Sequence, residues 1–311
     1  MKLQEIFVEN VQSACPKEGE KWLAELPELI TYCEKRWRLT MYQPYELSFN
    51  YVAPAIFDDG SEAVVKIGLP GGEHKDEIKA LRSLNRKGIV KLIDDDPIKR
   101  VLILEKIQPG QMLAELEDDE KATRVAAELA RNLVVPVPSH SSIPTTKERE
   151  NNLKQICMDH CNGLGPISSQ TLNQALQIFT YMNNSIQYPT LLHGDFHHYN
   201  VLQKGDGSWV AIDPKGIVGE IAYDLIQFLL NCLPVHGKKE TIRKRVKIFT
   251  ELLNLDHERF LLWGYCHTVL ATAWTVDENT GKFEENFYLA IDIFKDLYKS
   301  HYHRTIIAGI S

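Results

Sequence analysis

Two short segments carry three polar side chains at spacings that suit phosphoryl transfer. His193–Asn200 reads HGDFHHYN and places Asp195 five residues before Asn200. Asp213 follows thirteen residues later, and the apolar segments between predict a β-hairpin. Phosphoryl transfer to an alcohol needs a carboxylate to orient the attacking hydroxyl, and oxygen ligands to hold Mg²⁺ at the nucleotide phosphates. We therefore predict Asp195 as the catalytic group and Asn200 with Asp213 as the metal ligands.

The spacing from His193 to Asn200 is that of a kinase catalytic loop, with Gly194 where protein kinases have arginine. This change suits a small-molecule kinase that lacks activation-loop control. Amide and carboxylate oxygens are hard ligands, which favours Mg²⁺ over zinc. The task of Asp195 is then to place the acceptor hydroxyl in line with the γ-phosphate of ATP.

A lysine ends the apolar run Ala63–Lys66, on what we predict to be the third strand of a small sheet. A lysine at a strand end is more often exposed to solvent. Kinases, however, place on this strand the lysine that contacts the α- and β-phosphates, and a glutamate on the next helix pairs with it. We predict Lys66 for the first role and Glu77 for the second, with Glu73 as the alternative partner.

The segment Tyr45–Val52 occupies the place of the loop that covers the nucleotide, but it contains no glycine. A glycine-poor loop can still cover phosphates through backbone amides or polar side chains, with a less close approach. Ser48 and Asn50 are the predicted contacts.

The composition describes an ordinary globular protein, with 311 residues, 44% hydrophobic and 25% charged. A net charge of −7 argues against nucleic acid or an anionic membrane as a partner. No membrane span or signal sequence is recognisable, and the six cysteines are scattered, so we expect a cytoplasmic protein with reduced thiols. The sequence leaves open whether it is a monomer or a homodimer.

Hydrophobic periodicity predicts the helices and strands, and their order resembles that of a bilobal, protein-kinase-like α+β fold. The first lobe, 1–106, combines a leading helix with a small antiparallel sheet, and its predicted elements are helix 22–37, strands 39–42, 50–57 and 62–67, helix 76–85, and strands 90–93 and 101–104. A boundary at 107–111 opens a larger, mostly helical lobe, 107–311. Its predicted elements are helix 122–133, a loop at 135–142, helices 147–161 and 168–185, strands 191–192, 201–203 and 209–212, and helices from 222 onward.

The histidines His193, His197 and His198 allow a second hypothesis, a metallohydrolase cluster. Such a site needs further ligands and gives no reason for Asn200 or Asp213. We therefore assign His193 to bracing the catalytic loop, and leave the other two facing the cleft or solvent.

A third hypothesis is a pseudokinase that binds nucleotide, or binds none, and serves as an interaction module. Pseudokinases usually lack the catalytic carboxylate, a metal ligand or the strand lysine. This chain has candidates for all three, in Asp195, Asp213 and Lys66, which favours an active enzyme.

With these motifs, the chain resembles the aminoglycoside/hydroxyurea antibiotic-resistance kinase family, which includes streptomycin 6-phosphotransferases, within the aminoglycoside-phosphotransferase, kinase-like superfamily. The most family-specific piece is Asp213–Gly216, Asp-Pro-Lys-Gly. The resemblance extends over nearly the whole chain, and the segments that carry it are 50–55, 63–68, 104–110, 192–202, 211–216, 219–224 and 271–274.

The resemblance implies further roles. The backbone from Glu105 to Ile107 is expected to form the hinge that bonds the adenine of ATP. Asp224 is expected to brace the catalytic loop through its backbone amides. Lys215 is expected either to contact phosphate or substrate, or to pair with Glu220.

The acceptor predicted from the resemblance is an alcohol group of a streptomycin-type aminoglycoside. Glu220 and Asp277 are candidates to meet guanidinium or ammonium groups, and Trp274 to stack on a ring. The alternative is an unknown sugar or amino-alcohol metabolite.

Overall fold

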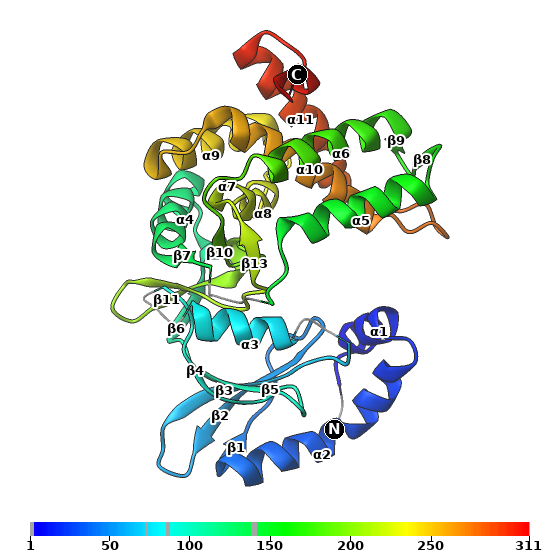
Figure 1. Ribbon diagram of the computed structural model, residues 1–311. Coiled ribbons are helices and arrows are strands. Elements are labelled where there is room, and N and C mark those ends of the chain that lie inside the picture. The colour runs from blue at the N-terminus through cyan, green and yellow to red at the C-terminus, as the bar shows by residue number, and fades with distance from the viewer. Residues whose placement is uncertain (1–2, 72–73, 85–87, 138–141, 311) are drawn as a thin grey trace. The chain divides into compact units, whose positions relative to one another are not determined.

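The computed structural model describes residues 3–71, 74–84, 88–137 and 142–310, and the chain divides into two compact units (Figure 1). Unit 1 comprises Met1–Gly110 and Gln203–Lys215. Unit 2 comprises Gln111–Leu202 and Gly216–Ser311. The chain therefore passes from one unit to the other three times. The boundary predicted from the sequence is at 107, whereas unit 1 continues to Gly110 and also includes the thirteen residues Gln203–Lys215.

Unit 1 is built on an antiparallel sheet with the strand order β1-β2-β3-β5-β4. Its helices and strands are α1 (Glu5–Ala14), α2 (Glu18–Trp37), β1 (Leu39–Met41), β2 (Tyr51–Phe57), β3 (Glu62–Ile67), α3 (His74–Ser83), β4 (Leu92–Asp96), β5 (Val101–Glu105) and β12 (Trp209–Ala211). Two further strands, β6 (Pro109–Met112) and β11 (Val201–Lys204), span the boundaries between the units.

The hairpin between β2 and β3 follows from its turn residues. Ile56 pairs with Glu62, and Gly60 takes a φ of 85° that a residue with a side chain rarely adopts. The Asp59 carboxylate accepts hydrogen bonds from the backbone N–H and the hydroxyl of Ser61. This confirms the predicted hairpin, and with it the place of Lys66 on the third strand.

Helices α1 and α2, dark blue in Figure 1, supply the apolar partners for this sheet. The shared core includes Phe7 of α1, Trp22 of α2, and Ala63, Val65 and Ile67 of β3. Successive side chains of a strand point to opposite faces. The alternation therefore turns the side chain of Lys66, which lies between Val65 and Ile67, away from α1 and α2.

The segment that returns to unit 1 is held by backbone hydrogen bonds. The N–H of Val90 donates to the carbonyl of Ala211 at 2.9 Å, and the N–H of Ala211 donates to the carbonyl of Gly88 at 2.8 Å. This places Asp213, two residues further on, in the same unit as Lys66. Pairing between residues so distant in sequence leaves no local pattern, so the sequence alone does not predict it.

Unit 2 is mostly helical, with a small sheet of order β13-β10-β7 and the hairpin β8-β9. Its α-helices are α4 (Asp119–Leu133), α5 (Thr146–Asp159), α6 (Ser169–Asn184), α7 (Ile221–Asp224), α8 (Ile226–Leu230), α9 (Lys238–Leu253), α10 (His257–Thr275) and α11 (Glu285–Tyr302). The shorter elements are η1 (Leu113–Glu115), β7 (Val135–Pro136), β8 (Gly163–Leu164), β9 (Ile167–Ser168), β10 (Thr190–Leu192), η2 (His198–Asn200), β13 (Ile217–Gly219) and η3 (Ile306–Ile310).

Helix α10 forms the centre of unit 2. Every residue from Phe260 to Ala273 is buried, as expected for a helix that is apolar all round and enclosed by other helices. It packs against α6 and α11. At the α11 contact, a Cβ on Gly264 would lie 2.3 Å from the ring of Phe294, so only glycine allows this close approach. No helix in the described ranges combines the length and the apolarity that a membrane crossing needs.

The predicted elements agree with the structure except at short or terminal ones. Helix α2 begins at Glu18 rather than Trp22, and α1 and β13 were not predicted. The predicted loop at 135–142 is wrong at its start, because β7 pairs there with β10; residues 138–141 lie outside the described part of the chain. A two-residue strand is defined by its partner and not by periodicity.

Buried charge joins α4 and α9. Arg245 of α9 is fully buried and donates to both carboxylate oxygens of Asp119 at the start of α4. Its guanidinium also donates to backbone carbonyls at the end of α8 and just beyond, those of Phe228, Leu229, Asn231 and Cys232. One side chain therefore ties three helices together.

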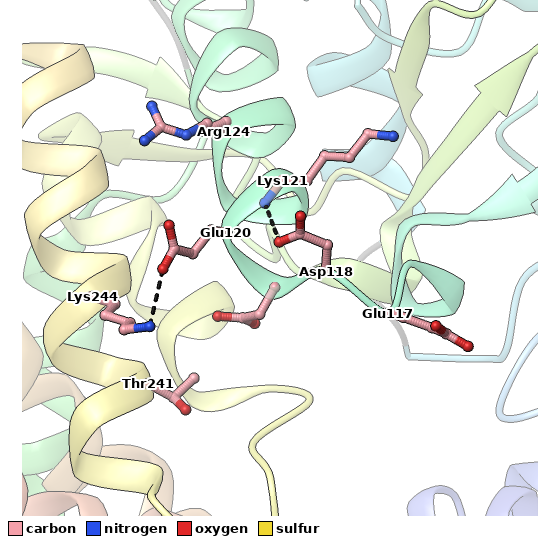
Figure 2. A pocket seen from close by; sticks show the side chains of 8 residues that line it. Glu117, Asp118, Glu120, Lys121, Arg124, Thr241 and Lys244 are labelled. Atoms are coloured by element: carbon pink, nitrogen blue, oxygen red, sulfur yellow. Dashed lines mark hydrogen bonds and ion pairs between the residues drawn. The ribbon is translucent and has the colours of Figure 1, made fainter.

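A charged surface pocket lies beside this junction (Figure 2). Lys244 of α9 reaches Glu120 of α4 at 3.0 Å, and the Asp118 carboxylate caps α4 by accepting from the N–H of Lys121. The other lining residues are Glu117, Asp119, Arg124 and Thr241. None of the predicted site residues lines this pocket, and its ion pairs belong to the packing of α4 on α9.

We expect Arg245→Ala to destabilise the protein by about 3 kcal/mol or more, because Asp119 and several carbonyls lose their donor. Urea unfolding measures this loss. The matched control is Arg243→Ala on the same helix, which removes an exposed pair with Glu240 and should change stability by less than about 0.5 kcal/mol. Equal effects of the two substitutions would contradict the assignment.

Candidate functional site

Backbone hydrogen bonds fix the direction in which the chain runs from strand β10 to the predicted catalytic residue, Asp195. β10 pairs with β13, so that Leu192 lies opposite Ile217. Just beyond this pair, the N–H of Gly216 donates to the carbonyl of His193 at 2.9 Å. Gly194 then takes a φ of 84°, which turns the chain into the loop that begins at Asp195.

The Asp224 carboxylate at the end of α7 holds this turn. One of its oxygens accepts from the N–H of His193 at 2.9 Å, and the other accepts from the N–H of Gly194 at 2.7 Å. Burial raises the pKa of Asp224 to about 7, although the two N–H groups act in the opposite direction. These are the contacts that a brace of the loop requires.

Within the loop, Asp195 and Asn200 are connected directly. The Asn200 side-chain N–H₂ donates to the backbone carbonyl of Asp195 at 3.0 Å, and Asn200 is nearly buried. The Asp195 carboxylate retains more exposure, with 28% of its side chain accessible. His197 lies beside both, its Nε2 atom 3.5 Å from a carboxylate oxygen of Asp195.

The three histidines of the motif occupy separate environments. The Nδ1 atom of His193 accepts from the N–H of Asp195, and the His198 ring stacks on Phe228 with centroids 3.7 Å apart. Burial lowers the pKa of His198 to about 2. Across the described residues, no three His, Cys, Asp or Glu side chains form a group able to hold a metal ion. The metallohydrolase hypothesis therefore lacks a ligand set there.

Unit 1 contains the predicted nucleotide-binding lysine. Lys66 of β3 is buried and donates to a carboxylate oxygen of Glu77 on α3 at 2.8 Å. It also forms an ion pair with Asp213. Burial by itself would lower the pKa of Lys66, but these two carboxylates outweigh that effect and raise it. The lysine is therefore held as a cation. The alternative partner, Glu73, lies outside the described residues.

Asp213 adopts a left-handed backbone conformation, with a φ of 58°. Non-glycine residues seldom adopt this region, and those that do are concentrated at functional sites. The next residue but one, Lys215, contributes positive charge that acts on Glu77. The Asp213–Gly216 segment thus concentrates charge around the buried lysine.

The predicted nucleotide loop lies between β1 and β2 and is held by side chains. The carbonyl of Ser48 accepts from the side chain of Asn10, and the Asn50 side chain accepts from the N–H of Leu69 at 3.1 Å. The predicted hinge begins at the end of β5. There the Glu105 carboxylate accepts from the N–H of Lys91 at 2.8 Å and pairs with Lys204 at 3.3 Å. Two residues further on, Ile107 leads into β6.

Two of the candidate substrate carboxylates are engaged inside unit 2. Glu220 makes a bidentate pair with Arg259 and accepts from the indole N–H of Trp263 at 2.7 Å. Asp277 accepts from the hydroxyl of Thr280 and from neighbouring backbone N–H groups. Asp277 remains at the surface, whereas Glu220 joins the start of α7 to α10.

Trp274, at the end of α10, remains 43% exposed but already has partners. The Arg149 guanidinium lies over its ring, 5.3 Å from the centroid, and its indole N–H donates to Asn152. The edge of the ring packs near His267. The Arg149 guanidinium therefore already lies over the indole ring that we predicted to stack on a substrate ring.

Sequence reasoning gave no role to His197, which the structure brings against Asp195 and Asn200. Its position three residues before Asn200 was a usable signal, because one turn of 3-10 helix brings residues i and i+3 together.

Comparison with known proteins shows which family the sequence matches. Residues 40–279 match the model of the aminoglycoside/hydroxyurea antibiotic resistance kinases. A streptomycin 6-kinase of Streptomyces glaucescens is 27% identical over 290 residues, which cover 91% of this chain and 94% of that protein.

Solved structures agree on the fold. The choline kinase LicA of Streptococcus pneumoniae aligns with a TM-score of 0.63 at 15% identity, covering 89% of this chain and 99% of that one. Aminoglycoside phosphotransferase APH(4)-Ia, solved with ADP and hygromycin B, aligns with a TM-score of 0.56 at 13% identity, covering 87% and 98%. The protein-kinase-like α+β fold is thereby confirmed. The chain belongs to the aminoglycoside/hydroxyurea antibiotic resistance kinase family, and it is a phosphotransferase whose acceptor is an alcohol group.

Proposed function

We propose that this protein transfers the γ-phosphate of ATP to an alcohol group of a streptomycin-type aminoglycoside or a related small molecule. The observation that carries the proposal is the loop in unit 2, where Asp224 fixes the backbone before Asp195 and where Asn200 bonds back to it. A carboxylate held in this way suits the orientation of a hydroxyl nucleophile. The relatives with kinase names support the use of a nucleotide.

In this proposal, Asp195 accepts a hydrogen bond from the acceptor hydroxyl and aligns its oxygen with the γ-phosphorus. As the new O–P bond forms and the bond to the β-phosphate breaks, the hydroxyl proton passes to the Asp195 carboxylate. The brace by Asp224 limits the freedom of this carboxylate, because the backbone just before it cannot turn.

Unit 1 is proposed to contact the nucleotide phosphates through Lys66, kept charged and oriented by Glu77. Asn200 and Asp213 are the proposed Mg²⁺ ligands. The donor set fits, since the Asn200 N–H₂ group is bonded to the Asp195 carbonyl and its oxygen is the atom left for a hard cation. When bound, Mg²⁺ neutralises the phosphate oxygens.

One observation favours a second class of acceptor. Arg149 places a positive charge over the exposed ring of Trp274, which suits a neutral or anionic acceptor at that surface better than a polycation. The streptomycin 6-kinases among the relatives favour an aminoglycoside. A sugar or another neutral polyol is therefore the alternative acceptor.

We expect Mg·ATP to raise the melting temperature of the purified protein, because a ligand of the folded state alone adds about 2.7 kcal/mol at a hundredfold excess over Kd. Differential scanning fluorimetry with and without nucleotide measures the shift. Mg²⁺ alone is the control. Unchanged melting with every Mg-nucleoside triphosphate at millimolar concentration would support the pseudokinase hypothesis.

Asp195→Asn should lower the rate of phosphoryl transfer by about 10²-fold or more while it leaves nucleotide affinity near the wild-type value. Asp213→Asn should instead weaken the binding of Mg·ATP, because a metal ligand loses its charge. Steady-state kinetics and calorimetric titration separate the two effects. Wild-type turnover by the Asp195 variant would remove the proposed catalytic role.

A screen of ATP consumption should find an alcohol acceptor among aminoglycosides, sugars and amino alcohols, and mass spectrometry should locate the phosphate on its oxygen. If streptomycin is the acceptor, a susceptible bacterium that expresses the protein should become resistant. Unchanged sensitivity, with no phosphorylated drug, would remove the antibiotic and leave the neutral polyols. Transfer to a protein side chain instead would overturn the small-molecule proposal.

A further inference from the structure

His197 lies inside the catalytic loop, and the proposed reaction gives it no part. We propose that His197 is a positioning residue whose Nε2 atom fixes the side-chain amide of Asn200, so that the amide oxygen is presented to the metal ion. This inference rests on the proposed function, since it concerns one of the two proposed Mg²⁺ ligands.

The orientation of the Asn200 amide follows from its neighbours. Its nitrogen lies 3.0 Å from the Asp195 carbonyl oxygen and 3.2 Å from Nε2 of His197. Exchanging the amide oxygen and nitrogen would place two oxygens 3.0 Å apart, which is repulsive. The nitrogen must therefore face the carbonyl. Its second hydrogen then points to His197.

This arrangement also determines where His197 carries its proton. An Nε2 atom that accepts from Asn200 is unprotonated, so the proton of the neutral ring is on Nδ1. The Nδ1 atom is buried, and no hydrogen-bond partner for it occurs among the described residues. A buried donor without a partner costs free energy. The hydrogen bond that Nε2 accepts from Asn200 is thus the interaction that offsets this cost.

The same assignment accounts for the spacing to the catalytic carboxylate. Nε2 lies 3.5 Å from a carboxylate oxygen of Asp195, beyond the usual length of a charge-assisted hydrogen bond. Without a proton on Nε2, His197 does not donate to Asp195. The histidine therefore acts on the proposed metal ligand, Asn200. The orientation of the acceptor hydroxyl is the task of Asp195 alone.

The backbone adds a second constraint between the same residues. The N–H of Asn200 donates to the carbonyl of His197 at 3.0 Å, closing the turn of η2. The rings of His197 and Tyr199 meet in a T-shaped arrangement, with centroids 6.0 Å apart. Side-chain and backbone contacts thus make His197 and Asn200 one rigid element, as expected of a metal ligand and the group that orients it.

The test measures metal binding and not turnover. Mn²⁺, a paramagnetic substitute for Mg²⁺, is titrated against the protein saturated with a non-hydrolysable ATP analogue, and free Mn²⁺ is followed by electron paramagnetic resonance. We expect His197→Ala to raise the Kd for Mn²⁺ by about 10-fold or more, the usual effect of losing a group that orients a metal ligand. The affinity for the analogue without metal should not change.

Two polar substitutions make the test specific. In His197→Gln, the side-chain oxygen reaches the position of Nε2 and can accept from Asn200, so Mn²⁺ affinity should stay within about 3-fold of wild type. In His197→Asn, the side chain is one methylene shorter and reaches only the position of Nδ1. Its affinity should fall as for alanine, and this Gln and Asn pair keeps the test valid if the alanine variant does not fold.

Tyr199→Phe is the control for general disturbance of the loop, and we expect wild-type Mn²⁺ affinity. Equal Mn²⁺ affinity in wild type, His197→Ala and His197→Asn would overturn the positioning role while the proposed function stands. Equal losses in the Gln and Asn variants would also overturn it, because the accepting atom would then not matter. A wild-type protein that binds no Mn²⁺ with any nucleotide would overturn both the proposed function and this inference.

Discussion

The Asp224 carboxylate accepts hydrogen bonds from two consecutive backbone N–H groups, and the conformation of the loop in unit 2 depends on this pair of bonds. A loop that begins with a glycine at a φ of 84° can adopt many other backbone conformations, and each costs little free energy. One carboxylate that accepts from both His193 and Gly194 removes most of them. Asp195 and Asn200 follow from this point within six residues, so their positions depend on it.

The same physical device, a charge held by several partners at once, recurs elsewhere in the chain. Lys66 stays cationic in a buried place because two carboxylates outweigh its loss of hydration. Arg245 binds Asp119 and carbonyls at the end of α8 and just beyond it. Buried charges are costly unless they are paired and hydrogen-bonded. Each of these residues therefore fixes elements that are distant in sequence.

The acidic and aromatic residues that were candidates to bind the acceptor already have partners within the protein. Glu220 serves the packing of α7 on α10, and Trp274 already carries Arg149 over its ring. Neither is an unoccupied site for a polycation. The proposed catalytic residues lie instead in the loop itself, where short-range hydrogen bonds set the geometry.

The sequence by itself predicted the candidate residues of the site and most of the long elements. Spacing alone brought out Asp195, Asn200 and Asp213, because a catalytic loop needs fixed residue types at fixed intervals. Periodicity predicted the β2-β3 hairpin and α4, because each buries one face over several residues.

Only the tertiary structure decided which partners these residues have. The return of Gln203–Lys215 to unit 1, the short strands β7 and β13, and the contacts of His197 all depend on residues far apart in sequence or on the orientation of one side chain. Such contacts leave no periodic trace, because a two-residue strand or a single accepting nitrogen is defined by what lies opposite it. Residue types specify which bonds are possible, and packing selects the ones that form.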